Sequence, residues 1–383
     1  MRMTVKFTVL GLLLCGVVSP AHAQYTIHEG MPDLPNKGPG TALGVVIWNH
    51  GVSGSHTQSH VPPAYVATLM RAGWDVRRIA RDAQNESNWT AAGMRHVGRT
   101  LEEIEKAKAD GYKRVVLAGQ SYGGAITVES SRRVDVWAII PSAPGWGIAH
   151  SHIGTLTDQN QGTIQLLAGL GDTRATRAIG ILPFQDEFAL SSPERGRRSR
   201  EIAAGRGLPY LALDDDSGLV SHGASSSALM NFAYGECVAR FLHPDFEPKK
   251  GVNLCGEGGL PVGPRKLKET AELKPARMSA GEHWIYFQGV WTGAWTNPAL
   301  LSVAIERDGN DYFLVYLRGQ NGNDQLGTRT RTPATLEGRN VVTQTPTQKI
   351  TLIYDNNTRQ VRLRWDDSQG RNGSTLLKKD RDS

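Results

Sequence analysis

Residues 114–126 read RVVLAGQSYGGAI, and this stretch decides the fold. The apolar, β-branched run at 115–117 is typical of a buried strand, and 124–128 can begin a helix. Between them, Gly119-Gln120-Ser121-Tyr122-Gly123 sets a serine between two glycines. A strand, a sharp turn and a helix form a nucleophile elbow, which lifts a serine hydroxyl above the edge of a sheet and needs small neighbours. The stretch therefore predicts that Ser121 is a nucleophile.

Apolar strands alternate with helix-like segments from residue 42 to residue 243. In the segment 90–108, for example, apolar residues recur every three or four positions, as in an amphipathic helix. We expect strands at 43–48, 73–79, 114–118, 134–140, 178–184 and 208–213, and helices at 63–72, 90–108, 192–204 and 224–242. This alternation predicts an α/β fold with a doubly wound, mostly parallel sheet covered by helices on both faces.

Residues 147–177 interrupt the alternation, because the segment is longer than a strand–helix connection needs. We interpret it as a cap insertion over the substrate, with a short helix at 163–168. Its histidines, His150 and His152, favour a polar surface loop over a metal site, because no carboxylate or cysteine lies at ligand spacing. The sequence predicts no metal ion and no other cofactor.

The C-terminal part has a different pattern. Residues 244–280 are rich in Pro, Gly and Lys and lack periodicity, which indicates a linker after a first domain at 24–243. Residues 281–383 read as an all-β domain, in which Asp308-Gly309-Asn310 joins the strands 300–307 and 312–318 in a hairpin. A second hairpin is expected between 350–354 and 360–365. We predict a separate antiparallel barrel or sandwich.

Residues 1–23 have the three parts of a secretory signal peptide. Arg2 and Lys6 give a positive start, an apolar run follows at 9–18, and Ala21-His22-Ala23 forms a cleavage site before Gln24. The apolar run is shorter than the ~20 residues that span a bilayer, so the mature chain is expected to have no integral membrane segment. We therefore expect a periplasmic or secreted protein.

The cysteines and the charge agree with an exported protein that does not bind nucleic acid. Cys237 and Cys255 remain after signal removal and predict a disulfide, with two unpaired buried thiols as the alternative. The net charge is +6, or +4 without Arg2 and Lys6. No basic stripe with interleaved aromatic residues accompanies this mild charge, so nucleic acid is not an expected partner.

A serine nucleophile needs a base, and the base needs a partner that holds its tautomer. In this architecture the acid and the histidine follow the serine on later strands. His222 lies in a loop between a strand and a helix, with Gly218 and Gly223 on either side. We predict that His222 is the base.

The acid is expected just after the strand 178–184, where Asp186 is preferred and Glu187 is the alternative. Three aspartates at 214–216 leave the same strand as His222 and read more simply as solvated turn residues, and Asp172 is a further competitor. The oxyanion hole needs two N–H donors, for which we predict Tyr122 and Val52. His50, before Val52, is expected to brace its loop and not to touch substrate.

With these residues identified, 42–243 resembles the α/β-hydrolase superfamily, with a likeness to serine esterases. The resemblance is carried by His50-Gly51, by the elbow at 119–123, and by Asp186 and His222 in the order Ser–Asp–His. Two departures are the missing Gly-x-x-Asp form at the acid and Ser221 in place of glycine before the histidine. The C-terminal part is similar to lipocalin-like or sandwich domains only through a G-x-W pattern.

The resemblance implies an acyl-enzyme mechanism in which Ser121 attacks, His222 shuttles the proton and Asp186 orients His222. We therefore expect an exported serine hydrolase that cleaves small-molecule carboxylic esters; a serine peptidase of the same fold is the nearest alternative. In a different class, the chain could be a non-catalytic protein that binds glycan or envelope polymer through Trp291 and Trp295. The other interpretation of these tryptophans is that they fill the core of the β domain.

Overall fold

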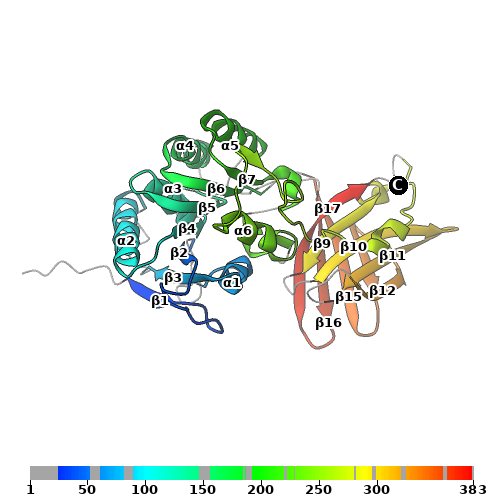
Figure 1. Cartoon of the computed structure of the whole chain (residues 1–383). Helices are drawn as coiled ribbons and strands as arrows, with labels where there is room; N and C mark the ends of the chain where they lie inside the picture. Colours follow the sequence, from blue (N-terminus) through cyan, green and yellow to red (C-terminus); the bar gives the residue numbers. More distant parts are fainter. Residues whose placement is uncertain are drawn as a thin grey trace, which may run out of the picture.

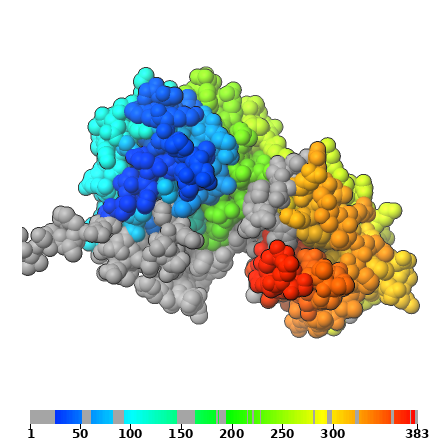
Figure 2. All heavy atoms as spheres, turned by 90° about the horizontal axis from the view of Figure 1, so that it is seen from below, coloured from blue at the N-terminus to red at the C-terminus, as the bar shows by residue number. Residues whose placement is uncertain are grey.

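The chain forms two lobes, each built around one β-sheet (Figure 1). Figure 2 shows from below that the C-terminal strands, in orange and red, form a lobe of their own. The computed structural model describes residues 25–51, 61–81, 89–145, 156–183, 186, 192–219, 222–227, 229–279, 282–295, 299–320, 325–356 and 360–381.

The sheet of the N-terminal lobe has the strand order β1-β3-β2-β4-β5-β6-β7-β8. Only β1 runs antiparallel to its neighbour among these described strands; the other neighbouring pairs are parallel. The strands are β1 (Thr26–Glu29), β2 (Gly44–Asn49), β3 (Trp74–Ala80), β4 (Val115–Gln120), β5 (Val136–Ser142), β6 (Ala175–Ile181), β7 (Tyr210–Leu213) and β8 (Val252–Asn253). The prediction of a mostly parallel sheet is confirmed.

Helices cover both faces of this sheet (Figure 1). One face carries α1 (Ala64–Arg71) and α6 (Gly235–Leu242); the other carries α2 (Trp89–Ala109), α3 (Tyr122–Ser131), α4 (Leu156–Asp172) and α5 (Ser192–Arg206). Because successive strand residues point to opposite faces, Val46 packs beneath α1 and α6, whereas Val45 and Ile47 join the cluster on the other face. In the ranges that the structure describes, no helix is both long and apolar enough to cross a bilayer.

The segment expected to form a cap differs from that expectation. Most of it folds as α4 and the start of β6, which together make an ordinary crossover on the sheet. Leu166 and Leu170 lie on the same face of α4 at helical spacing and are buried in the apolar cluster, so this face covers the sheet and not a substrate. Residues 146–155, including His150 and His152, lie outside the described residues.

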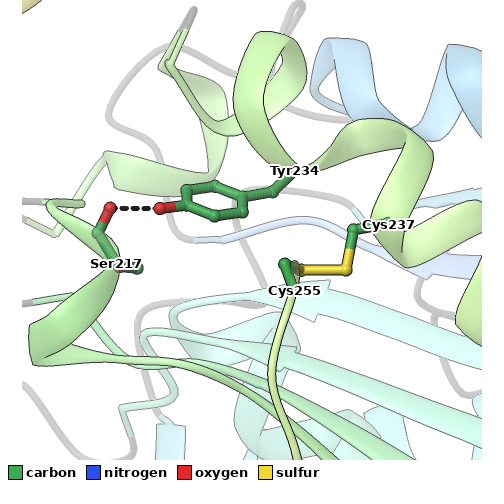
Figure 3. Close-up of a disulfide and its surroundings, with 4 residues drawn as sticks. All are labelled: Ser217, Tyr234, Cys237 and Cys255. Atoms are coloured by element: carbon green, nitrogen blue, oxygen red, sulfur yellow. Dashed lines mark hydrogen bonds between the residues drawn. A yellow bond between two sulfur atoms is a disulfide. The ribbon is translucent and has the colours of Figure 1, made fainter. Parts of the chain in front are cut away.

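The predicted helix at 224–242 and the predicted linker also differ in detail. The helix is divided into a 3-10 turn (Ala224–Ser226), a π-helix (Met230–Tyr234) and α6. The linker is structured, since it adds β8 to the sheet beside β7 and its Cys255 bonds to Cys237 of α6 (Figure 3). The predicted disulfide is therefore confirmed.

The C-terminal lobe is an antiparallel, nearly closed barrel with the strand order β12-β11-β10-β9-β17-β16-β15-β14-β13. Its strands are β9 (Val290–Trp295), β10 (Ala299–Asp308), β11 (Asp311–Gly319), β12 (Leu326–Pro333), β13 (Thr335–Glu337), β14 (Asn340–Gln344), β15 (Gln348–Asp355), β16 (Gln360–Asp367) and β17 (Asn372–Arg381). Both predicted hairpins are present, as β10–β11 and β15–β16.

Trp291 belongs to the interior of the barrel. It is 2% exposed, and its indole N–H donates to the carbonyl of Phe287 at 3.1 Å. Around it pack apolar side chains from strands across the barrel, among them Leu301, Leu352 and Leu377. The interpretation of Trp291 as a core residue is confirmed, and its ring does not form a surface on which a sugar could stack.

Candidate active site

Ser121 occupies the turn between β4 and α3 with φ 56° and ψ −120°. A positive φ is strained for a residue that has a side chain, so the surroundings must hold it. They do so through two backbone hydrogen bonds: Ser121 N–H donates to Ser142 O at 2.9 Å, and Gly145 N–H donates to Ser121 O at 3.1 Å. The end of β5 thus supports the elbow.

The glycines around Ser121 are required by close backbone packing. A β-carbon on Gly119 would lie 2.3 Å from the carbonyl oxygen of Gly123. One on Gly123 would lie 2.0 Å from the carbonyl oxygen of Asn49, at the end of β2. These distances are far below van der Waals contact, so the motif's glycines let β2, β4 and α3 converge on the turn.

Asp186 and His222 meet in a hydrogen bond. Asp186 follows β6 and His222 follows β7, and His222 Nδ1 lies 2.8 Å from Asp186 Oδ1. Because β4, β6 and β7 are parallel, their carboxyl ends lie at one edge of the sheet, where Ser121 also sits. The side-chain amide of Gln120 donates to the carbonyl of His222 at 3.3 Å and so ties the histidine loop to the elbow.

The loop before His222 is held by contacts from the helical segment behind it. The Tyr234 hydroxyl donates to the carbonyl of Ser217, as Figure 3 shows. In the same view, the disulfide links Cys237 to Cys255 beside this contact. Arg265 donates to the carbonyl of Asp216 at 3.3 Å. The position of His222 is thus supported by Tyr234 and by the residues that follow α6.

Arg195 of α5 completes the surroundings of the acid. Its Nη2 donates to Asp186 Oδ2 at 2.9 Å, and both side chains are 1% exposed. Burial alone would raise the pKa of Asp186, but the hydrogen bond and charge of His222, and then those of Arg195, lower it to about 2. An ionised Asp186 favours the tautomer with a proton on His222 Nδ1, so Nε2 becomes the basic nitrogen.

The competing carboxylates have other partners. Asp214 forms two hydrogen bonds with Arg200, one of them at 2.7 Å, and Asp216 lies 3.1 Å from the same guanidinium. Asp172 pairs with Arg132 at 2.8 Å and precedes β6, which places it at the opposite edge of the sheet. Asp215 begins a 3-10 turn, and Glu187 lies outside the described residues. Within the described ranges, no cluster of His, Cys, Asp and Glu could hold a metal ion.

Tyr122 is the first residue of α3, so its backbone N–H belongs to the first turn of the helix. The N–H groups of a first turn do not take part in the hydrogen bonds within the helix. Its ring is 1% exposed, and its hydroxyl lies 2.7 Å from His96 Nδ1. Burial, followed by the charges of Arg81 and Arg95, lowers the pKa of His96 to about 3, so this partner is neutral at ordinary pH.

The second predicted oxyanion donor, Val52, lies outside the described residues. His50, two positions earlier, is 3% exposed; its Nε2 accepts the backbone N–H of Arg81 at 3.1 Å, and its Nδ1 lies 2.6 Å from the carbonyl of Gly51. These contacts agree with a bracing role. Arg195, Gln120 and His96 were not predicted from the sequence, because no local pattern marks their roles. Gln120 and His96 contact partners 102 and 26 positions away, and Arg195 is one of several arginines in α5.

The order of the strands, the strained serine after β4, and the Asp and His that follow β6 and β7 define an α/β-hydrolase fold for the N-terminal lobe. No model of a known protein family matches the sequence, and no curated protein is similar to it.

Several solved structures match part of the chain at low sequence identity. An esterase of Pyrococcus furiosus is 14% identical, with a TM-score of 0.40 over 57% of this chain and 92% of its own. Est1E of Butyrivibrio proteoclasticus is 16% identical, with a TM-score of 0.34 over 47% of this chain and 82% of its own. A puromycin-hydrolyzing peptidase of Mycobacterium tuberculosis is 16% identical, with a TM-score of 0.40 over 60% of this chain and 38% of its own.

Proposed function

We propose that the protein is an exported serine hydrolase that cleaves carboxylic esters through an acyl-enzyme intermediate. The observation that carries this proposal is the partly buried Asp186–His222 hydrogen bond at the sheet edge that also holds Ser121 in its strained turn. Holding a serine at φ 56° costs free energy, and a domain that served only as a scaffold would gain nothing from this strain.

The proposed reaction has two steps. In the first, His222 Nε2 takes the proton of the Ser121 hydroxyl while the oxygen attacks the ester carbonyl, and the imidazolium then gives this proton to the leaving alcohol. In the second, water attacks the acyl-enzyme and loses a proton to His222. The imidazolium returns this proton to the Ser121 oxygen as the acyl bond breaks, so the carboxylic acid leaves with Ser121 and His222 restored. Asp186 stays ionised and stabilises the imidazolium in both steps.

Backbone N–H groups stabilise the oxyanion in this proposal. The donors are those of Tyr122, at the start of α3, and of Val52, in the loop after β2. Loss of one such donor typically lowers the rate by about 10²–10³. Gly51 supports the approach of the loop, because a β-carbon there would lie 3.3 Å from the Ser121 β-carbon.

The choice of esters follows the resemblance to serine esterases, and a serine peptidase is the alternative. Export rests on the predicted signal peptide at 1–23, and the Cys237–Cys255 disulfide is compatible with an oxidising compartment. Sequencing the amino terminus of the exported protein tests the cleavage: we expect Gln24, and any other first residue would contradict the predicted site.

The proposal is tested with a fluorophosphonate probe and a panel of p-nitrophenyl esters and aminoacyl anilides. We expect the probe to label Ser121, and Ser121→Ala to lower kcat for esters by a factor on the order of 10⁶. Ser130→Ala is the matched control, because Ser130 is a buried serine of the same helix, α3, away from the turn. Faster cleavage of anilides than of esters would favour the peptidase. A chain that is neither labelled nor active would contradict the hydrolase proposal and favour the non-catalytic alternative.

A further inference from the structure

A large cavity lies between the two lobes. Its volume is about 740 Å³, enough for a ligand of substantial size. One wall comes from the loop that carries His222 and the residues after it; the other comes from β9, β16 and β17, which Figure 1 shows on the side of the barrel next to the N-terminal lobe. The segment after α6 supplies Arg265 and Lys266.

The cavity lies against the loop that carries the proposed base. Gly223 and Ala224, which line it, follow His222 in the chain, and Gly218 and Leu219 line it from the preceding side. The side chain of His222 itself is 14% exposed. A ligand that occupies the cavity therefore lies against the loop that carries the catalytic imidazole.

The two lobes pack around this cavity and do not merely face one another. Leu229 and Phe232, from the N-terminal lobe, pack against a cluster that includes Val290 and Leu317 of the barrel. Leu267 and Leu273, between the lobes, are buried in the same cluster. This packing fixes β9, β16 and β17 relative to the His222 loop, so the cavity has a defined shape.

The lining is strongly basic. It contains five basic residues and two acidic ones. Both acidic side chains are paired with cations: Asp380 with Lys266 at 2.8 Å, and Asp216 with Arg200 at 3.1 Å. With five basic and two acidic residues, the lining has a net charge of +3, to which Arg362 and Lys378 contribute. A concave, positively charged wall concentrates anions and favours carboxylate or phosphate groups.

From this cavity we infer that the physiological ester carries a negatively charged group, which the barrel wall binds through Arg362 and Lys378 while the ester reaches Ser121. The inference rests on the proposed hydrolase function and specifies its substrate class. The anionic group can belong to the acyl chain or to the leaving alcohol, and the two sources are distinguished by the substrates used in the test.

The test compares matched pairs of esters. For the acyl side, p-nitrophenyl hydrogen glutarate and hydrogen sebacate are compared with their methyl esters; for the leaving group, 4-acetoxybenzoate is compared with methyl 4-acetoxybenzoate. We expect wild type to prefer the charged member of at least one pair. The double variant Arg362→Gln, Lys378→Gln should lower that preference, as a ratio of kcat/KM, about tenfold, because each charged hydrogen bond contributes substantially to binding.

Arg364→Gln is the matched control. Arg364 lies on β16 two positions from Arg362, pairs with Asp366 at 2.9 Å, and does not line the cavity. It should leave the preference unchanged. The preference of wild type should also fall with added salt, which screens exposed charges beyond about 10 Å at 0.1 M. Ser121-dependent turnover without any preference for charged esters would overturn the inference and leave the hydrolase proposal standing.

A binding measurement separates the anion site from catalysis. Calorimetric titration of Ser121→Ala with suberate, and in a separate cell with phosphate, should show binding that the Arg362→Gln, Lys378→Gln changes weaken about tenfold. Such binding would support the anion site even if no ester were cleaved. Equal titration curves with and without the two substitutions would overturn it.

Discussion

Gly123 is the residue of the elbow with the least room. Because its β-carbon would lie 2.0 Å from the carbonyl oxygen of Asn49, Gly123→Ala must push α3 away from β2 and move Ser121. We expect ester hydrolysis to fall at least about 10²-fold, as for other small displacements of catalytic groups, and the melting temperature to fall as well. Gly98→Ala is the control: nothing lies within 4 Å of that position, and alanine there should stabilise α2 by about 0.5–1 kcal/mol. Similar effects of the two changes would contradict this account.

Arg195 should control the acid limb of the pH profile. Its positive charge is one of the influences that lower the pKa of Asp186, after the contribution of His222. The proposed reaction also needs a neutral His222, because its Nε2 accepts the Ser121 proton, and an imidazole protonates at a higher pH than a carboxyl group whose pKa is about 2. The acid limb therefore reports protonation of the Asp186–His222 pair. Arg195→Gln removes a positive charge beside this pair and so favours its protonated form, and the acid limb of kcat/KM should move to higher pH by about 1 unit.

Arg200→Gln provides the comparison for Arg195. Arg200 lies on the same helix, α5, but binds Asp214 in place of Asp186. Its loss should lower stability without moving the acid limb, whereas Arg195→Lys, which keeps the charge, should restore part of the wild-type profile. An unchanged acid limb in Arg195→Gln would show that Arg195 serves packing alone.

At the candidate site, the sequence predicts residues only where a local signature marks them. Ser121 is marked by the glycines that the elbow needs within two positions, and His222 and Asp186 are marked by the strands that they follow; their catalytic roles stay predictions. Arg195 has no such signature: it is one of several arginines in α5, and only the packing of α5 against the sheet determines that it contacts Asp186 and that Arg200 contacts Asp214.

At the scale of the elements, the Cys237–Cys255 disulfide contributes to stability by a covalent link. It joins Cys237 of α6 to Cys255, two residues after the end of β8, and so closes a loop with a sequence separation of 18. A loop of this size is expected to stabilise the fold by about 3 kcal/mol, through the restricted unfolded chain. We expect dithiothreitol to lower the midpoint of urea unfolding for wild type, and Cys237→Ser with Cys255→Ser to lower it equally. Dithiothreitol should then have no further effect on the double variant; a further decrease would point to another cause.

The interruption of the helix at 224–242 shows why some elements could not be predicted. The apolar residues of this segment continue at helical spacing, so the sequence favours one helix. In the structure, the carbonyl of Ala233 accepts the N–H of Gly263 at 2.8 Å, a partner thirty residues away, within the π-helix Met230–Tyr234. The spacing of apolar residues predicts which face of a helix is buried. It does not predict which distant backbone N–H will replace one of the helix's own hydrogen bonds. The widened turn sets Tyr234 beside Ser217 and so affects the His222 loop.

For the whole molecule, the sequence predicted two lobes of the right classes, because alternation of strands with helices and repeated hairpins are local patterns. It did not predict how the lobes meet. Residues 244–280 were interpreted as a linker because they lack periodicity, yet Leu267 and Leu273 are buried between the lobes. Single apolar residues in a segment rich in Pro and Gly give no periodic signal, and their partners are known only once both lobes have folded.

The packing between the lobes leads to a prediction about the barrel. A chain that ends after Pro264 keeps β8 and the disulfide but exposes Leu229 and Phe232, which pack against the shared cluster in the full chain. These residues follow His222 by 7 and 10 positions, so their exposure should loosen the His222 loop as well as remove apolar burial. We expect the free energy of unfolding to fall by about 2 kcal/mol, and turnover of p-nitrophenyl acetate to fall with it.

Phe232→Ala in the full chain should reproduce part of both effects, whereas Tyr286→Ala, on the exposed surface of the barrel, should reproduce neither. If the shortened chain melted and turned over like the full one, the barrel would serve substrate binding without supporting the catalytic loop.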